Sequence, residues 1–428
     1  MKKSLLFVGM LLSLSLSAQK HYYWQANADF SQFGRVIDVA EVSPSVVALQ
    51  TFKLGSDYSF ISGNVSLFDL KNEKEGKSIE ITNLEEYRGG FGKMADGSLV
   101  INTLNPENKY EIQLYKPNTA NLELDVEGKI QGSFAGIPGG IVPVYGGGYV
   151  LAASFPNKDN GQFNLQLFAK TKGHSFGLKN QNSDVSMAIN ILMKPSFMNG
   201  MHNFSSLVTS PAILSYCSQL ALLENEKVLA LTTFDDKKDK FPTKITCYGQ
   251  DLTELWGIGI SGAGYGFKPV TTGEGNEWFL TTFNTNKGDV SVTTIQKYDD
   301  DELVTKKVIS EFEANGSITL NNGNICVYGF KTFANGQKLP AFYVLSASNL
   351  EIKKSWELSE NDEPCKDISE LMNQAVTLPG KFYTATQMSN GDVVFGGHII
   401  SFSTVKDPAT KVQSTFNYMM VMPAEFFK

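Results

Sequence analysis

The chain has 428 residues and a formal net charge of −7 at neutral pH, from 37 Lys and Arg residues against 44 Asp and Glu residues. An acidic chain lacks the excess of cations that neutralises phosphates, so we expect no nucleic-acid partner. Arginine occurs only at Arg35 and Arg88, which makes bidentate recognition of carboxylate or phosphate scarce.

The N-terminus has the pattern of an export signal. Lys2 and Lys3 precede an apolar run over 5–16, and the small residues Ser17-Ala18 stand before Gln19. The run is too short for a membrane span, and its flanks are those of a cleaved signal peptide. We expect residues 1–18 to be removed, which takes away two lysines and moves the net charge from −7 to −9.

The mature chain, residues 19–428, is therefore expected to be exported, either to the periplasm or to the outside of the cell. The Ser-Ala-Gln ending resembles signal peptides that are common in the Bacteroidetes. No later stretch approaches the ~18 consecutive apolar residues of a spanning helix, so we expect no transmembrane segment.

One local pattern recurs along the mature chain: a short apolar run, a turn, and a β-rich run. Each copy predicts two antiparallel strands joined by a tight hairpin, because Gly, Asn and Asp accept the positive φ of such turns. In chain order the copies lie at 42–49, 94–102, 144–152, 223–231, 272–280, 320–328 and 388–396.

The spacing of these turns indicates a repeat architecture. From Gly97 onward the steps between turn residues are 50, 79, 49, 48 and 68 residues, and three of the five are near the length of one four-stranded propeller blade. The turn residues used are Gly97, Gly147, Glu226, Gly275, Gly323 and Gly391.

A third and a fourth strand follow each hairpin. The predicted third strands lie at 110–115, 163–168, 244–248, 290–298 and 342–345, and the outermost strands hold Trp256 and Trp356 shortly after a polar turn. With Gly391-Asp-Val-Val-Phe-Gly-Gly397, this pattern resembles kelch, quinoprotein-like and related propeller repeats over essentially the whole mature chain. The resemblance is to the architecture, and it assigns no specific family.

The predicted fold is therefore all-β, a single seven-bladed β-propeller domain of four-stranded antiparallel blades. Six or eight blades stay open, because the region 175–215 has room for a distorted unit. We letter the strands of a blade A to D from the central channel outward.

The two ends of the chain predict how the ring closes. The last unit has strands near 382–388, 392–398 and 416–422, and the chain reaches Lys428 without a fourth. At the other end, the segment around Trp24 has no partner of its own, and its Trp matches those of the outer strands. We expect this N-terminal strand to complete the last blade, which removes two unpaired sheet edges.

Three long segments are expected on one face of the propeller. The insertions at 181–212 and 359–380 join blade to blade, and 399–414 joins strands B and C of the last blade. Both kinds of connection open on the same face, and functional loops gather on such a face of a rigid scaffold. The alternative, which we weigh equally, is that the insertions only cover the channel mouth.

Four residues on this face are candidates for ligand binding. His202 and Phe204 belong to an apolar loop of the first insertion, and Asp235 and Asp236 belong to a B–C loop. The loop that holds His202 and Phe204 is also typical of packed filler. Just before it, 183–193 reads as a short helix ended by Pro195, and in the second insertion 367–374 reads as one or two helical turns.

Motifs for chemistry are absent from the sequence. The four histidines have no metal-binding spacing, no GxSxG occurs, and we expect neither a metal nor a cofactor. The acidic run 299–302 falls in a C–D turn on the opposite face and reads as a solvated hairpin. For Cys217, Cys247, Cys326 and Cys365, inert buried thiols and one disulfide both stay open.

These observations favour a non-catalytic, monomeric binding or scaffold module for a protein or glycan, acting through the insertion-bearing face. The alternative is a secreted hydrolase or lyase with its active site at the channel mouth, and a weaker one is a component of an outer-membrane assembly. Clustered carboxylates, or His with Asp, at the mouth favour the enzyme. A lining of Ser, Thr and apolar residues favours the binding module.

Overall fold

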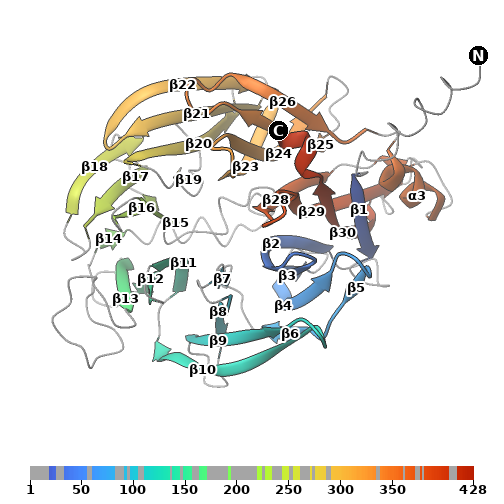
Figure 1. The fold of residues 1–428 in the computed structure, drawn as a ribbon, viewed down its shortest axis with the longest axis horizontal. Coiled ribbons are helices and arrows are strands. Elements are labelled where there is room, and N and C mark those ends of the chain that lie inside the picture. Colours follow the sequence, from blue (N-terminus) through green and yellow to red (C-terminus); the bar gives the residue numbers. More distant parts are fainter. Residues whose placement is uncertain are drawn as a thin grey trace, which may run out of the picture.

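The computed structural model describes residues 19–25, 33–54, 60–81, 91–93, 97–104, 110–134, 137–144, 148–156, 163–170, 191–193, 219–223, 227–233, 243–249, 254–260, 270–271, 275–285, 291–333, 338–359, 362–371, 376–377, 380–403 and 412–428. Within these residues the strands pair into seven antiparallel sheets, which Figure 1 shows set around a common centre. We number the sheets 1 to 7 in chain order.

Sheets 1 to 4 follow each other along the first part of the chain. Sheet 1 is β2 (Phe33–Ser43), β3 (Val46–Leu54), β4 (Phe60–Asp69), β5 (Lys74–Glu75) and β6 (Ile79–Ile81). Sheet 2 is β7 (Phe91–Lys93), β8 (Leu99–Leu104), β9 (Tyr110–Asn118) and β10 (Glu123–Phe134). Sheet 3 is β11 (Ile137–Val144), β12 (Gly148–Pro156), β13 (Phe163–Lys170) and β14 (Ile191–Met193). Sheet 4 is β15 (Gln219–Leu222), β16 (Val228–Thr233), β17 (Thr243–Tyr248) and β18 (Glu254–Ile260).

Sheets 5 to 7 complete the arrangement. Sheet 5 is β19 (Val270–Thr271), β20 (Glu277–Thr285), β21 (Ser291–Asp299) and β22 (Glu302–Ser310). Sheet 6 is β23 (Phe312–Thr319), β24 (Ile325–Thr332), β25 (Lys338–Leu345) and β26 (Ile352–Glu357). Sheet 7 is β27 (Val376–Thr377), β28 (Gly380–Gln387), β29 (Val393–Ser403), β30 (Val412–Met422) and β1 (Lys20–Gln25). The described helices are α3 (Glu363–Leu371) and α4 (Ala424–Phe427).

The hairpins that the sequence predicts are formed by the first two strands of sheets 1 to 6 and by β28 and β29 of sheet 7. Each repeat copy spans the turn between two paired antiparallel strands. Gly97, Gly275, Gly323 and Gly391 sit in four of these turns with positive φ, the conformation for which glycine is favoured. The mostly-β organisation in antiparallel sheets is therefore confirmed, with four strands in sheets 2 to 6 and a fifth strand in sheets 1 and 7.

The described hydrophobic core lies between neighbouring sheets. One cluster joins sheets 6 and 7 and includes Phe342, Phe382 and Phe395, all fully buried. Further clusters join sheets 1 and 2, sheets 4 and 5, and sheets 5 and 6. Burial of apolar side chains between the faces of adjacent sheets therefore holds the sheets side by side around the centre, as in a β-propeller.

The N-terminal strand β1 is the outermost strand of sheet 7, as predicted. It pairs with β30 from Lys20 opposite Val421 to Gln25 opposite Phe416. Trp24 thus lies on an outermost strand, as do Trp256 in β18 and Trp356 in β26. The match between these three tryptophans correctly predicted which strand the N-terminus supplies.

The third sheet corrects one sequence expectation. Ile191–Met193 form β14 and pair with Phe163–Leu165 of β13, where the sequence predicted the end of a helix over 183–193. Short apolar runs do not distinguish helix from strand by periodicity, and pairing with β13 decides the matter. The predicted insertion 181–212 thus contributes the outer strand of sheet 3, and its other residues lie outside the described part.

The second predicted insertion, 359–380, contains α3 and β27. The helix begins four residues before the predicted helical turns at 367–374 and contacts β1, where the Tyr23 hydroxyl donates a hydrogen bond to Asp367. At the other end of the chain, Lys354 of β26 donates hydrogen bonds to the carbonyl oxygens of Phe426 and Lys428, at 2.6 and 2.9 Å. In the described part of the chain, neither helix has the length and apolar character to cross a membrane.

Candidate functional site

Three charged side chains occupy the same position in three consecutive sheets. The innermost strands β23, β28 and β2 each contain a β-bulge, and the residue two places before the bulge is charged in all three. These charged residues are Glu313, Lys381 and Arg35. The bulged residues are Asn315, Tyr383 and Ile37.

This position lies at one end of the innermost strands, the end that the sequence analysis assigned to the binding face and to the channel mouth. Glu313, Lys381 and Arg35 are near the starts of their strands, so they lie at the end of the sheets where blade-to-blade connections arrive. Lys338 and Ser291, at the starts of two third strands, reach the same end. In antiparallel sheets these strand starts share one face with the B–C loops. We call these residues, with Tyr383 and His398, the mouth cluster.

Glu313 is the described carboxylate at the centre of the cluster. Its side chain is buried, and the Ser291 hydroxyl donates a hydrogen bond to its Oε2 at 3.3 Å. Burial raises the pKa of Glu313, while the nearby ammonium groups of Lys381 and Lys338 act in the opposite direction. The neighbouring ammonium groups therefore stabilise the ionised form of a carboxyl group that burial destabilises.

The amine of Lys381 is the group in the cluster with a pKa near neutral pH. Burial is the main cause and lowers its pKa to about 7; Glu313 opposes this shift, whereas Arg35 and Lys338 add to it. The Lys381 Nζ lies 4.8 Å from the ring centroid of Phe330, and Lys338 Nζ lies 5.1 Å from the same centroid. One aromatic ring therefore supports two ammonium groups through cation–π contacts.

Arg35, Tyr383 and His398 form the other side of the cluster. The Arg35 guanidinium is buried, and its Nη1 donates a hydrogen bond to the Tyr383 hydroxyl at 3.1 Å. Burial raises the pKa of Tyr383 to about 12, so the phenol is neutral. The His398 ring lies 5.3 Å from the Tyr383 ring, and burial, with the two cations Arg35 and Lys381, holds its pKa well below the usual range.

The cluster therefore combines cations with neutral polar rings. His398 is an uncharged imidazole, and its Nδ1 has no hydrogen-bond partner within the described residues. Asp38, the next carboxylate along β2, accepts hydrogen bonds from Val39 N at 2.9 Å and Thr384 Oγ1 at 3.3 Å. Such a set suits the binding of an anionic group, and the amine of Lys381 can also exchange a proton near neutral pH.

The described mouth fits neither of the two linings that the sequence analysis distinguished. Around Lys381 the nearby carboxylate is Glu313, among cations, with Asp38 farther along β2, and the lining is not a plain surface of Ser, Thr and apolar side chains. Over the described ranges, no three His, Cys, Asp or Glu side chains are grouped so that they could hold a metal ion. The binding residues predicted from the loops, His202, Phe204, Asp235 and Asp236, all lie outside the described residues.

The acidic run 299–302 forms the predicted C–D hairpin. Its second residue, Asp300, also makes polar contacts with neighbouring turns. Lys227 of sheet 4 lies 3.5 Å from Asp300 Oδ1, and the Asn276 side-chain amide donates to Asp300 Oδ2 at 3.1 Å. The indole nitrogen of Trp278 donates to the Asp300 carbonyl oxygen at 2.7 Å. The turn thus joins sheets 4 and 5, which corrects the expectation of a solvated hairpin.

Two of the four cysteines are inert buried thiols. Cys247 and Cys326 are free, and burial raises the pKa of the Cys247 thiol to about 12 and that of Cys326 further still. A thiol with a raised pKa forms little thiolate and is unreactive. Cys365 is buried in α3, and Cys217 lies outside the described residues.

Two of the three charged positions stand at the same distance before the turn glycine of their hairpin. Glu313 stands ten residues before Gly323, and Lys381 stands ten residues before Gly391. Counting back by the same step from Gly97, Glu226 and Gly275 gives tyrosines in the sequence. These are Tyr87, Tyr216 and Tyr265, which lie outside the described residues.

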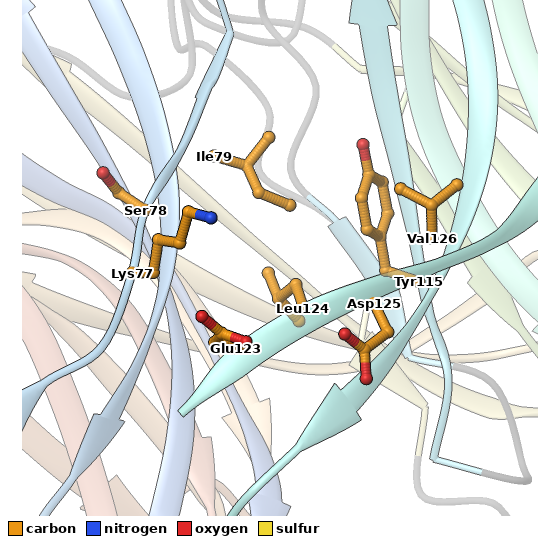
Figure 2. A pocket seen from close by; sticks show the side chains of 8 residues that line it. All are labelled: Lys77, Ser78, Ile79, Tyr115, Glu123, Leu124, Asp125 and Val126. Atoms are coloured by element: carbon orange, nitrogen blue, oxygen red, sulfur yellow. The ribbon is translucent and has the colours of Figure 1, made fainter. Parts of the chain in front are cut away.

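A second candidate site is a pocket of about 230 Å³ between the outer parts of sheets 1 and 2 (Figure 2). One side comes from the segment that leads into β6, and the other comes from β9 and β10. The lining residues are Lys77, Ser78, Ile79, Tyr115, Glu123, Leu124, Asp125 and Val126. Its volume is below the about 300–1,000 Å³ of small-molecule pockets. Because most of its polar side chains are exposed, the mouth cluster is the stronger candidate.

Comparison with solved structures finds β-propeller domains. The β-propeller domain of the Trilobed protease from Pyrococcus furiosus is 13% identical, over 88% of this chain and 95% of that chain, with a TM-score of 0.46. Sqt1 from Chaetomium thermophilum, bound to the N-terminus of ribosomal protein L10, is 10% identical over 92% of this chain and 98% of that chain, with a TM-score of 0.45. KlAtg21, in complex with the coiled coil of AgAtg16, is 10% identical over 85% of this chain and 97% of that chain, with a TM-score of 0.43. No family model matches the sequence, and no curated protein matches it.

Proposed function

We propose that this chain is an exported, non-catalytic β-propeller that binds a protein or glycan through the face that carries the mouth cluster. The observation that carries the proposal is the placement of Glu313, Lys381 and Arg35 at one equivalent position in three consecutive sheets. Burying charged groups is costly, and a core of apolar residues would stabilise the fold better. Their placement at the mouth favours a role in recognition.

We further propose that the seven sheets are the seven blades of one closed ring. Sheet 7 contains the strands from both ends of the chain, through the pairing of β1 with β30. A hydrophobic cluster that includes Tyr22, Val36, Phe68 and Met419 lies between sheets 7 and 1. Closure of this kind brings Arg35 of sheet 1 beside Lys381 and Tyr383 of sheet 7, and it therefore builds the mouth cluster.

A second candidate function, a hydrolase or lyase, is favoured by one observation. The amine of Lys381, with its pKa of about 7, can transfer a proton near neutral pH. The binding role has the better support, because two of the three charged groups that act on Lys381 are cations, Arg35 and Lys338, and the third is Glu313.

The binding face is tested with a matched pair of exposed lysines. Lys338 lies at the mouth, and Lys71 lies in the C–D turn of sheet 1 on the opposite face. Binding is measured on an immobilised panel of acidic and neutral oligosaccharides and of acidic and basic peptides. For a panel ligand that the wild type binds, we expect Lys338→Ser to weaken the affinity by about fivefold, or about 1 kcal/mol. We expect Lys71→Ser to leave the affinity unchanged.

Three outcomes would contradict the proposal. The first is that the wild type binds nothing on the panel. The second is that the Lys338 and Lys71 variants change binding equally, which would contradict binding through the face that carries Lys338. The third is conversion of a bound ligand into products, followed by chromatography of the panel compounds, which would favour the hydrolase or lyase instead.

A further inference from the structure

We propose that the mouth cluster binds a single carboxylate group of the ligand, with Arg35 and Lys381 as its charged partners and Lys338 at the entrance. This inference rests on the proposed binding role and names the chemical group that the role requires. Neither the sequence motifs nor the candidate loop residues pointed to it.

The three cations are arranged in a row that alternates with two aromatic rings. Lys338 and Lys381 lie on the ring of Phe330, with Nζ-to-centroid distances of 5.1 and 4.8 Å. Lys381 and Arg35 in turn lie by the ring of Tyr383, with distances to its centroid of 5.8 Å from Nζ and 5.3 Å from Cζ. The two rings thus hold three cations side by side, an arrangement whose mutual repulsion an anion relieves.

The charge of the row favours a monoanion. The charged or titratable groups on the strands packed against β28 are Arg35 and Asp38 on β2, Glu313 on β23, Tyr328 on β24, Lys338 on β25 and His398 on β29, with Tyr383 on β28 itself. His398 and the two tyrosines are neutral. With Glu313 and Asp38 ionised, Arg35 and Lys338 balance them, so the cluster has no net charge before Lys381 takes up its proton and one positive charge afterwards. A single carboxylate matches the charge of the protonated cluster, whereas a phosphate dianion exceeds it.

Binding of the carboxylate is linked to uptake of a proton by Lys381. The amine has a pKa of about 7 in the free protein, mainly because it is buried. A neighbouring anion favours the protonated form and raises that pKa. Below pH 7 Lys381 already carries its charge and the affinity is at its maximum. As the pH rises above 7 the free site loses this charge, so the affinity falls by up to about tenfold per pH unit.

The linkage is tested by titration calorimetry of the full chain with glucuronate and with N-acetylglutamate α-amide, two sources of a single carboxylate, and with glucose as the neutral match. Each titration is run at pH 6 and pH 8.5, in two buffers of different ionisation enthalpy. We expect at least one acid to bind about tenfold or more tightly at pH 6 than at pH 8.5, with proton uptake above pH 7 and no binding of glucose. Which acid binds identifies the source as an acidic sugar or an acidic peptide.

Variants of Lys381 separate its charge from its titration. Lys381→Met is expected to lose most of the binding at pH 6. Lys381→Arg keeps a permanent positive charge, so it is expected to bind with equal affinity at pH 6 and pH 8.5. The matched control is Lys297→Met: Lys297 is also buried, lies 2.8 Å from Glu277 and 6.0 Å from the Phe279 ring centroid, and stands at the opposite end of its sheet. This control is expected to bind as the wild type does.

Circular dichroism and thermal melting establish that each variant is folded. If Lys381→Met does not fold, the exposed Lys338→Ser carries the test, and it is expected to weaken binding severalfold while the pH dependence stays.

Several results would overturn the inference: equal binding of glucose and glucuronate, an affinity for either acid that is independent of pH, or a Lys381→Arg variant that keeps the wild-type pH dependence. If neither acid binds but a ligand from the panel still binds through the face that carries Lys338, the carboxylate proposal is refuted and the binding role is not. Absence of any panel ligand refutes the binding role itself.

Discussion

Replacement of Gly397 by Ala is expected to lower the free energy of unfolding by about 3 kcal/mol. A Cβ at this position would overlap the carbonyl oxygen of Lys381 and lie 3.0 Å from the Cα of Phe382. Gly329 has the same relation to sheet 6, where a Cβ would overlap the Glu313 carbonyl and lie 2.9 Å from the Cα of Ala314. Backbone atoms cannot rotate away as side-chain ends do, so both substitutions displace the strands that carry the mouth cluster.

Chemical denaturation of the two glycine variants measures this loss. The control is Gly257→Ala in the outer strand β18, where the nearest atom to the new Cβ is 3.4 Å away, an ordinary contact. Its effect is expected to stay within about 0.5 kcal/mol. Unfolding of Gly397→Ala and Gly329→Ala at the denaturant concentration of the wild type would contradict the close approach of the bulged strands to their partners.

Replacement of Tyr22 by Ala is expected to cost about 4 kcal/mol, in the range found for large aromatic residues in cores. Tyr22 lies on β1, is 6% exposed, and packs edge-on against Phe68 of sheet 1 with ring centroids 5.4 Å apart. Its hydroxyl also donates a hydrogen bond to the carbonyl oxygen of Leu70 at 2.7 Å. The N-terminal strand thus completes sheet 7 and at the same time packs against sheet 1.

Two further variants separate packing from hydrogen bonding. Tyr22→Phe removes the hydroxyl alone and is expected to cost about 1 kcal/mol. Lys20→Ala changes an exposed residue on the same strand and is expected to have an effect within about 0.5 kcal/mol. If thermal and chemical unfolding show that Tyr22→Ala costs no more than Lys20→Ala, β1 does not hold sheets 7 and 1 together.

The repeat and the role of the N-terminal strand could be predicted because both depend on local chemistry. Turns at Gly275, Gly323 and Gly391 have positive φ, and that requirement is visible in the sequence as glycine within a recurring hairpin pattern. Trp24 matched the tryptophans of other outer strands, so its strand could be assigned to an unfilled edge. These features need no knowledge of how one sheet lies against the next.

The mouth cluster could not be predicted in the same way because it depends on contacts between sheets. Arg35 and Lys381 are far apart in the sequence, and they meet only because sheets 7 and 1 are neighbours. The bulges at Asn315 and Tyr383 leave no local mark, since Gly329 and Gly397 read simply as glycines within strands. The loop residues proposed from the sequence stay a prediction, because they lie outside the described residues.

The most direct test that Arg35, Glu313 and Lys381 share one buried site is an NMR titration of the Lys381 side-chain amine. We expect a midpoint at about pH 7 in the wild type. Glu313→Gln removes a neighbouring negative charge and should lower this midpoint, whereas Arg35→Gln removes a positive charge and should raise it. A midpoint near the ordinary lysine value of about 10.4, unchanged by either substitution, would contradict the shared site.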